Sequence, residues 1–291
     1  MPGDGPSSYD RDVVTWGEMW HEGGAIERLA VVPLDPGFMR HVRACNTAVL
    51  LGERLPFLLA GVPVGWVRRE IALALADFPG IDTGSDGVNL SAPPALPGIA
   101  QSLAERGMFR WRREAFDVRA PDGTVLGTID RGAIPSFGIE ATGVHVNGLI
   151  RRPDGLHVWV ARRAANKALD PGKLDHIVAG GVPAGLSPME CLIKEAAEEA
   201  SIPSELAAGA RHVGEIRYAM ERPEGLRRDW LHCYDLELPE GFEPRAADGE
   251  VESFELWPVE QVFAAVRDGD EFKFNVNLVL MDLFRRMGMV G

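Results

Sequence analysis

Hydrophobic and polar positions divide this chain into two differently patterned parts. Up to residue 139, three segments have the apolar spacing of helices: 36–48, 67–78 and 97–106. Residues 55–67 are apolar but interrupted by proline and glycine, which favours short strands or turns. Residues 116–119 and 125–130 flank a Pro-Asp-Gly turn and predict a hairpin. We therefore expect a small α+β domain over 1–139, without a recognisable catalytic constellation.

From residue 140 onward, strand patterns prevail. They recur at 144–150, 156–161, 210–220, 229–238 and 251–257. Helical spacing is found from Pro188 onward and again over 258–268 and 275–287. Strands that surround a central helix and are followed by a closing helix predict a mixed sheet with helices on both faces. We expect this second domain to span 140–291.

The helix that begins at Pro188 has an unusual polar face. Its apolar stripe consists of Met189, Leu192, Ile193, Ala196, Ala197 and Ala200. Glu195, Glu198 and Glu199 fall on the opposite side, within roughly 100° of one another. Carboxylates this close repel one another unless a cation lies among them. Oxygen ligands suit Mg²⁺ or Mn²⁺, so these three glutamates are candidate metal ligands and catalytic residues.

The residues before this helix favour a functional interpretation of its glutamates over a merely solvated face. Gly180, Gly181 and Gly185 form a loop whose backbone could approach an anion closely, so Gly180 and Gly181 are candidate substrate contacts. Ser187 is a natural N-cap, and Glu190 completes a capping box three residues later.

Residues 180–202 resemble the 23-residue box of the Nudix hydrolases, G-x5-E-x7-R-E-U-x-E-E-x-G-U with U apolar. The matching positions are Gly180, Glu195, Ala196, Glu198, Glu199 and Ile202. Leu186 replaces the first glutamate of the box, Lys194 its arginine and Ser201 its last glycine. The resemblance implies the Nudix α/β/α sandwich with a mixed sheet, and it implies that the glutamates hold the catalytic metal.

Further segments resemble one branch of this family, the Nudix part of thiamine pyrophosphokinase-related proteins with their uncharacterised amino-terminal domain. These segments are 143–148, 159–163, 171–175, 179–181, 234–239 and 248–254. The branch usually carries a small or apolar residue at the position of Leu186. The resemblance implies hydrolysis of a small organic diphosphate, with thiamine diphosphate or an oxidised analogue converted to the monophosphate. It also places a further catalytic carboxylate at Glu250, outside the box.

Basic residues before the glycine loop are candidates for binding the diphosphate. They are Arg162, Arg163, Lys167 and Lys173. Their cations could neutralise phosphate through charge-assisted hydrogen bonds. A solvated strand edge would produce the same pattern. Trp159 could stack on a flat ring, although core packing explains it equally well.

Composition limits the partners. A net charge of −13 disfavours a nucleic-acid backbone. The chain has no apolar run of membrane-spanning length, and residues 1–12 lack a secretion signal. Three cysteines without paired spacing fit a reducing compartment. We therefore expect a cytoplasmic enzyme that binds a small-molecule diphosphate and neither nucleic acid nor membrane. A homodimer is compatible with the sequence.

Three alternatives remain open at this stage. One is a Nudix pyrophosphatase acting on a nucleotide sugar or a nucleoside diphosphate derivative. Another is isopentenyl-diphosphate isomerase, whose chemistry uses a cysteine before the box, where this chain has none between Cys45 and Cys191. The third is a non-catalytic Nudix domain that binds a ligand without turnover, for which Leu186 is the best support.

Overall fold

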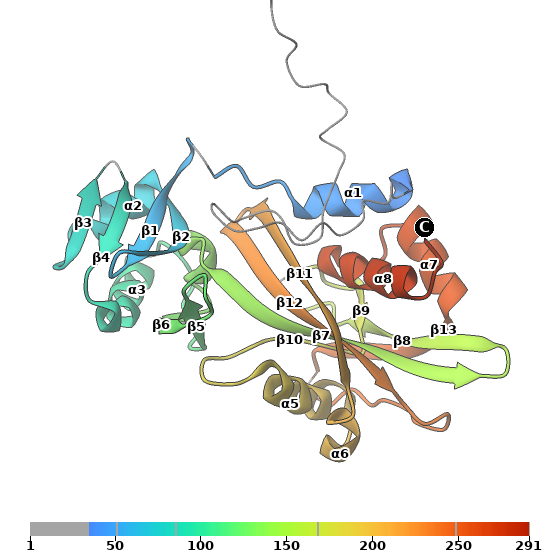
Figure 1. Ribbon diagram of the computed structural model, residues 1–291. Helices are drawn as coiled ribbons and strands as arrows, with labels where there is room; N and C mark the ends of the chain where they lie inside the picture. Colours follow the sequence, from blue (N-terminus) through green and yellow to red (C-terminus); the bar gives the residue numbers. More distant parts are fainter. Residues whose placement is uncertain (1–34, 51, 85, 168, 248, 291) are drawn as a thin grey trace, which may run out of the picture.

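The described residues fold into a four-stranded sheet, a seven-stranded sheet and a two-stranded hairpin, with helices around them (Figure 1). The structure is a computed structural model and describes residues 35–290 except 51, 85, 168 and 248. Residues 1–12, on which the expected location partly rests, lie outside the described residues. None of the helices within the described ranges is long and apolar enough to cross a bilayer.

The amino-terminal part is built on a four-stranded sheet in the order β2-β1-β4-β3. Its elements are β1 (Arg54–Leu59), β2 (Val62–Arg68), α2 (Arg69–Leu75), β3 (Ile81–Gly84), β4 (Gly87–Leu90), a 3-10 turn (Pro93–Ala95) and α3 (Leu96–Glu105). Residues 55–67, expected to form short strands or turns, form the antiparallel pair β1–β2. The helix expected at residue 67 begins at Arg69, because Val67 and Arg68 still pair with β1. The sequence pattern did not predict β3 and β4.

The hairpin expected over 116–130 is confirmed. It consists of β5 (Ala115–Arg119) and β6 (Val125–Asp130), and the short helix α4 (Ile134–Phe137) connects it to the second sheet. The apolar side chains of this hairpin share a core with the four-stranded sheet, in which Phe57 and Phe137 meet with ring centroids 5.1 Å apart.

A seven-stranded sheet forms the second part. Its strands are β7 (Glu140–Arg152), β8 (Gly155–Arg163), β9 (Leu174–His176), β10 (Val178–Gly181), β11 (Arg211–Arg222), β12 (Gly225–Glu237) and β13 (Val251–Pro258). The main path runs β11-β12-β7-β8-β13, while β10 pairs with β7 and β9 with β8. β12 and β7 are parallel and the other pairs antiparallel, so the sheet is mixed as expected.

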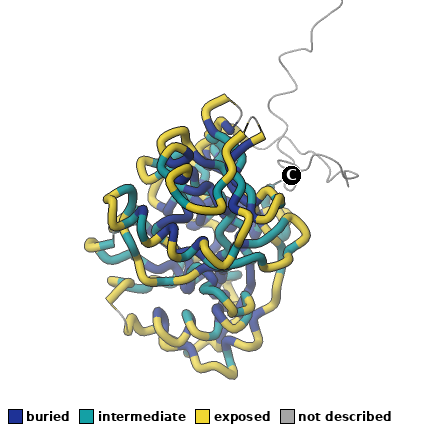
Figure 2. The backbone as a smooth tube through the Cα atoms, turned by 90° about the vertical axis from the view of Figure 1, so that its left-hand side faces the viewer, coloured by how far each residue is buried: buried dark blue, intermediate teal, exposed yellow. Residues whose placement is uncertain are grey.

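Helices cover both faces of this sheet (Figure 1). On one face lie α5 (Pro188–Ala200) and α6 (Ser204–Ala207). On the other lie α1 (Pro36–Cys45), α7 (Val259–Asp268) and α8 (Phe274–Arg286). Each face has its own apolar cluster, and Figure 2 shows the buried residues concentrated inside the fold. This arrangement confirms the sandwich with helices on both faces.

Helix α1 belongs by sequence to the first part but packs on the second. The ring of Phe38 lies 5.1 Å from that of Phe263 in α7 and 6.2 Å from that of Phe284 in α8. Met39, Val42 and Cys45 are buried in the same cluster. The amino-terminal part therefore supplies a helix to the core of the seven-stranded sheet.

Candidate active site

A strand, a loop and a capped helix present the glutamates. β10 ends at Gly181, the loop spans 182–187, and α5 begins at Pro188. The expected capping box is confirmed: the Ser187 side chain accepts from the Glu190 backbone N–H, and the Glu190 carboxylate accepts from the Ser187 backbone N–H at 2.8 Å. Glu190 is therefore fully explained by the cap, which fixes where the helix starts.

Gly180 is required by the way Glu195 packs against β10. A β-carbon at Gly180 would lie 2.7 Å from Cγ and 2.8 Å from Cδ of Glu195. Side chains do not approach that closely, so any larger residue at this position would push Glu195 out of place. At Gly181 a β-carbon would lie 2.7 Å from Cζ of Phe116, in the amino-terminal hairpin. Both glycines therefore have a packing role.

The amino-terminal hairpin also bonds directly to the loop before α5. The backbone N–H of Ala184 donates to the carbonyl oxygen of Ala115 at 2.7 Å. The N–H of Gly185 lies 3.4 Å from Oδ2 of Asp117, a long hydrogen bond. β5 therefore lies alongside the loop that leads into the glutamate helix.

The three box glutamates differ in exposure, and this corrects the expected helix face. Glu198 is half exposed, Glu195 is mostly covered and Glu199 is 8% exposed. Ala197, expected in the apolar stripe, is exposed instead. The helix is therefore rotated relative to the prediction. Glu199 faces the sheet because its Oε2 accepts the backbone N–H of Ala179 in β10 at 2.9 Å.

The charges around these glutamates indicate a site for a cation. The ammonium of Lys194 lies 3.0 Å from Oε1 of Glu195 and 2.6 Å from Oε2 of Glu198, and these carboxylates raise its pKa. Burial, together with the charges of Asp175, Glu195 and Glu250, raises the pKa of Glu199 to about 8 against the opposing effect of the Ala179 hydrogen bond. These carboxylates attract the ammonium of Lys194 and favour the protonated form of Glu199. Such surroundings suit a divalent cation.

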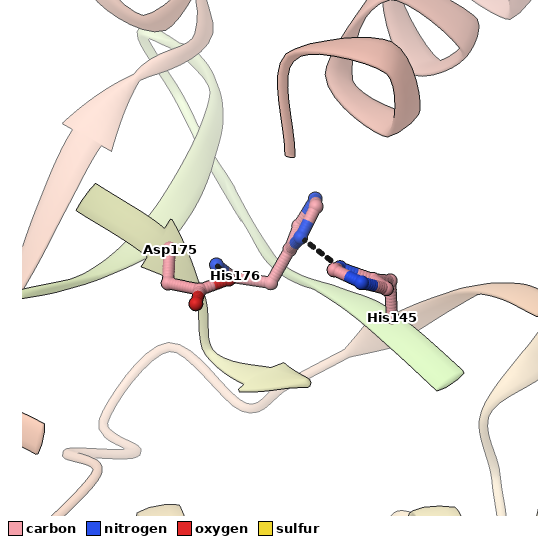
Figure 3. A group of neighbouring side chains, drawn as sticks. All are labelled: His145, Asp175 and His176. Atoms are coloured by element: carbon pink, nitrogen blue, oxygen red, sulfur yellow. Dashed lines mark hydrogen bonds between the residues drawn. The ribbon is translucent and has the colours of Figure 1, made fainter. Parts of the chain in front are cut away.

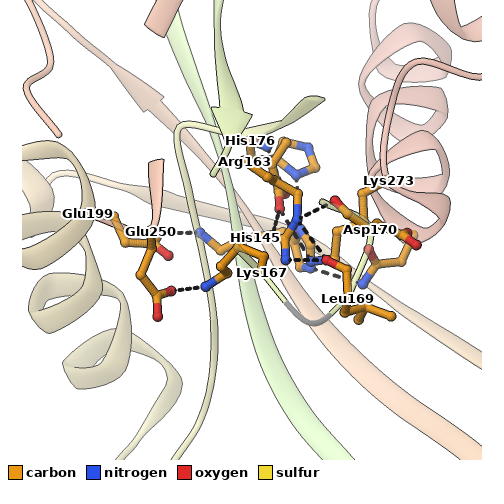
Figure 4. A network of polar contacts seen from close by, with 12 residues as sticks. His145, Arg163, Lys167, Leu169, Asp170, His176, Glu199, Glu250 and Lys273 are labelled. Atoms are coloured by element: carbon orange, nitrogen blue, oxygen red, sulfur yellow. Dashed lines mark hydrogen bonds and ion pairs between the residues drawn. The ribbon is translucent and has the colours of Figure 1, made fainter. Parts of the chain in front are cut away.

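Glu250 joins this cluster from another part of the chain. Lys167 donates a hydrogen bond to Oε2 of Glu250 (Figure 4). The backbone N–H of Ala164 donates to the backbone oxygen of Glu250 at 3.0 Å. Figure 4 draws Glu250 next to Glu199, and its charge is one of those that raise the pKa of Glu199. Lys167 and Glu250 thus belong to the same site as the box glutamates.

Arg163 is engaged in the protein interior. Its Nη1 donates to Oδ2 of Asp175 at 2.7 Å, its Nη2 to the carbonyl oxygen of Leu169 at 2.8 Å and its Nε to that of Asp170 at 3.1 Å (Figure 4). Its side chain is only 12% exposed. These bonds fix the start of the loop between β8 and β9, the same loop that carries Lys167.

Arg162 and Lys173 lie elsewhere. Both line a cavity of about 430 Å³ together with Trp257 and Asp270. Arg162 donates to the carbonyl oxygen of Gly172 at 3.0 Å, and Lys173 forms an ion pair with Asp270 at 2.8 Å. Of the four basic residues predicted to bind substrate, the structure thus places only Lys167 at the glutamates through a side-chain contact.

A buried polar network lies behind the site, and sequence reasoning missed two of its charged members, Asp175 and Lys273. Nδ1 of His145 and Nδ1 of His176 are 2.9 Å apart (Figure 3). Burial lowers the pKa of both imidazoles, that of His176 to about 4, so both are neutral at pH 7. Nζ of Lys273 lies 3.4 Å from Oδ2 of Asp175, which Arg163 also contacts. A metal bound here would have to displace two cations, so the cluster serves as a polar interior.

Comparisons with known proteins agree with this geometry. Residues 141–276 match the NUDIX domain family, and residues 37–141 match a domain of unknown function, DUF4743. Nudix hydrolase 20, chloroplastic, from Arabidopsis thaliana is 35% identical over 277 residues, which cover 87% of this chain and 74% of the relative. The chain belongs to the Nudix hydrolase family. It is thus an enzyme of a family that generally uses divalent metal ions.

Two further similarities were found. Nudix hydrolase 24, chloroplastic, from the same plant is 37% identical over 268 residues, covering 87% of this chain and 73% of the relative. A crystal structure of DR0079 from Deinococcus radiodurans is 22% identical, with a TM-score of 0.45, and covers 58% of this chain and 98% of that chain. The plant relatives span both parts of the chain, as the two family matches do.

Each departure from the Nudix box has a structural setting. Leu186 packs, half-buried, against the apolar cluster beneath α5. Lys194 joins Glu195 to Glu198 with a single ammonium, without the planar fork of an arginine. Ser201 ends the helix with φ of 53°, the left-handed conformation that explains a glycine at this box position. Its hydroxyl donates to the carbonyl oxygen of Arg245 at 3.0 Å.

The raised pKa of Glu199 predicts how stability depends on pH when metal is absent. Its folded pKa of about 8 lies above the ordinary value of 4.5, so folding favours the protonated form. This contribution is fully present below pH 4.5 and is lost as the pH rises through about 8. Urea unfolding of chelator-treated protein is expected to show stability falling by a few kcal/mol across this window.

Glu199→Gln keeps the shape of the side chain without its charge and should remove that part of the pH slope. Glu198→Gln is the matched control, because the half-exposed Glu198 carries no such burial cost. An unchanged slope in Glu199→Gln would contradict the assignment.

Proposed function

We propose that this Nudix hydrolase cleaves a diphosphate linkage in a small organic diphosphate, using Mg²⁺ or Mn²⁺ held by Glu195, Glu198 and Glu199. The observation that carries this proposal is that these three glutamates and Glu250 lie together. Glu199 is buried, and Glu195 and Glu198 share the ammonium of Lys194. Retention of these oxygen ligands favours turnover over a non-catalytic binding role.

A bound divalent ion would polarise a phosphoryl oxygen and activate a water molecule for attack at phosphorus. The protein's own residues position the reaction. The Ala179 amide fixes one oxygen of Glu199, and Gly180 lets Glu195 lie flat against β10. Glu198, on the same helix as the other two glutamates, is half exposed to solvent. It is therefore the glutamate of the three that an entering phosphate can reach most easily.

Glu250 is the residue that we propose as the general base. Its carboxylate is half exposed, so water can reach it, and Lys167 holds one of its oxygens. A base must lie within hydrogen-bond reach of the attacking water, and its place beside Glu199 meets that need. In this assignment Lys167 orients Glu250 and is the member of the four predicted basic residues that could also contact the diphosphate.

The proposed substrate is thiamine diphosphate or an oxidised analogue, cleaved to the monophosphate. Support for it comes from the resemblance of short segments within 143–181 and 234–254 to the Nudix part of thiamine pyrophosphokinase-related proteins. We also propose that the enzyme works in the cytoplasm, where its three buried, unpaired cysteines would remain reduced.

Hydrolysis of a panel of diphosphates with Mg²⁺, measured by chromatography of the monophosphate products, tests this substrate. Thiamine diphosphate and its oxidised analogues are expected to give a higher kcat/KM than nucleoside diphosphates, nucleotide sugars and ADP-ribose. A preference for a nucleotide would overturn the thiamine assignment and leave the hydrolase standing. Hydrolysis of no member of the panel, by a folded protein that binds Mg²⁺, would instead favour the non-catalytic alternative.

A further inference from the structure

Two histidines and a glutamate meet at the edge of the seven-stranded sheet, apart from the box glutamates. His212 and Glu215 lie on the edge strand β11, and His232 lies on β12, directly opposite Glu215. Oε1 of Glu215 is 3.6 Å from Nδ1 of His232 and 4.0 Å from Nε2 of His212. All three atoms lie within 4.8 Å of one another.

A bulge in β11 brings these side chains to one face. Residues three positions apart on a regular strand point to opposite faces of the sheet. The pairing of β11 with β12 shifts between His212 and Gly214, so that His212 faces Tyr234 and Glu215 faces His232. The extra residue re-aims the strand, as bulges do. Without it, His212 and Glu215 could not share a ligand.

The carboxylate of Glu215 is oriented for a ligand by a neighbouring side chain. The indole N–H of Trp230 donates to its Oε2 at 2.8 Å, which leaves Oε1 directed at the imidazoles. The separations of 3.6 and 4.0 Å are too long for hydrogen bonds. They are close to the roughly 3.3–3.6 Å between ligands of a tetrahedral metal whose bonds are about 2.0–2.2 Å long. His212 and Glu215 are nearly half exposed and can rotate to close the difference.

The neighbouring cations each have a carboxylate of their own. Arg217 stacks over the ring of Trp230 at 4.1 Å and lies 3.8 Å from Glu140. Arg119 is paired with Asp117 at 2.7 Å. This setting differs from the buried pair His145 and His176, where the nearby carboxylate is already bound by two cations.

We propose that His212, Glu215 and His232 bind a divalent transition-metal ion, with Zn²⁺ as the preferred occupant. Imidazole nitrogens favour such ions, whereas the box glutamates offer the oxygen ligands that suit Mg²⁺. Three protein ligands leave a fourth position open to water or an anionic group. The site is separate from the proposed hydrolysis and does not depend on it.

Metal binding to the stripped full-length protein tests this site, with excess Mg²⁺ present to occupy the box glutamates. The wild type is expected to bind one equivalent of Zn²⁺, and Co²⁺ in its place should give the visible bands of a nitrogen-ligated ion. His212→Ala and Glu215→Gln each should weaken binding by at least about 10-fold, and Trp230→Phe should weaken it less, because it removes only the orienting bond.

Glu237→Gln is the matched control, because it removes an exposed carboxylate from the same strand β12. It should bind Zn²⁺ like the wild type. The proposal is overturned if His212→Ala and Glu215→Gln bind Zn²⁺ as tightly as the wild type, or if the wild type binds none. Binding lost in His176→Asn but kept in His212→Ala would assign the metal to the buried histidine pair and would also overturn it.

Discussion

Glu198→Gln is expected to lower turnover by roughly 100-fold or more, since losing a metal ligand raises the barrier by several kcal/mol and each 1.4 kcal/mol is about tenfold in rate. A chelator should abolish turnover in the wild type, and added Mg²⁺ or Mn²⁺ should restore it. Because Glu198 is half exposed, its replacement should leave folding intact. Measuring kcat together with a thermal unfolding curve separates the two effects.

Glu190→Gln is the control for this experiment, since it alters a carboxylate on the same helix. Glutamine also completes a capping box, so both stability and turnover should be retained. If Glu190→Gln abolished turnover in a folded protein, Glu190 would be replacing the first glutamate of the Nudix box, at whose position this chain has Leu186. Full activity of the wild type in the presence of a chelator would contradict the metal-dependent mechanism altogether.

Asp175→Asn is expected to destabilise the fold by on the order of 3–5 kcal/mol, because it leaves two buried cations without their counter-charge. Burial alone would raise the pKa of Asp175, but Lys273, with Arg163 and the nearby imidazoles, holds it well below the ordinary range. The carboxylate therefore stays charged at neutral pH. The free energy of unfolding in urea measures the loss.

Asp154→Asn is the comparison for this second experiment. Asp154 lies in the exposed turn between β7 and β8, so its replacement should change the stability by less than about 0.5 kcal/mol. If Asp175→Asn were equally mild, the contacts of Asp175 with Arg163 and Lys273 would contribute little to the fold. Turnover should also fall in Asp175→Asn, because Arg163 fixes the loop that carries Lys167.

Local patterns were sufficient to predict the capped helix and most of the long strands. The apolar period located α5, but it could not reveal that Glu199 points inward. The sheet supplies the reason: the Ala179 amide, twenty positions earlier, bonds to the carboxylate. A helix-face argument that counts only apolar side chains cannot anticipate a carboxylate whose burial is offset by a backbone donor on another strand.

The basic residues show the same limit. Arg162, Arg163, Lys167 and Lys173 are close in sequence, but their side chains go to three different places. The loop between β8 and β9 separates them. The path of this loop depends on contacts with residues far away in the sequence, which a local sequence pattern cannot predict. Lys273 is one such partner, lying 98 positions away from Asp175. Strands β9 and β10 are short, and the sequence pattern did not separate them from the surrounding loop.

The contact between β5 and the loop before α5 bears on how the two parts of the chain can be studied. A fragment of residues 140–291 would keep every proposed metal ligand and still lose the backbone partner of Ala184 and the ring that packs on Gly181. Replacing Phe116 or Asp117, whose side chains contact Gly181 and Gly185, should therefore alter hydrolysis, although these residues lie outside the proposed ligand set. An activity assay is therefore a direct means of testing whether the segment of unknown function contributes to hydrolysis.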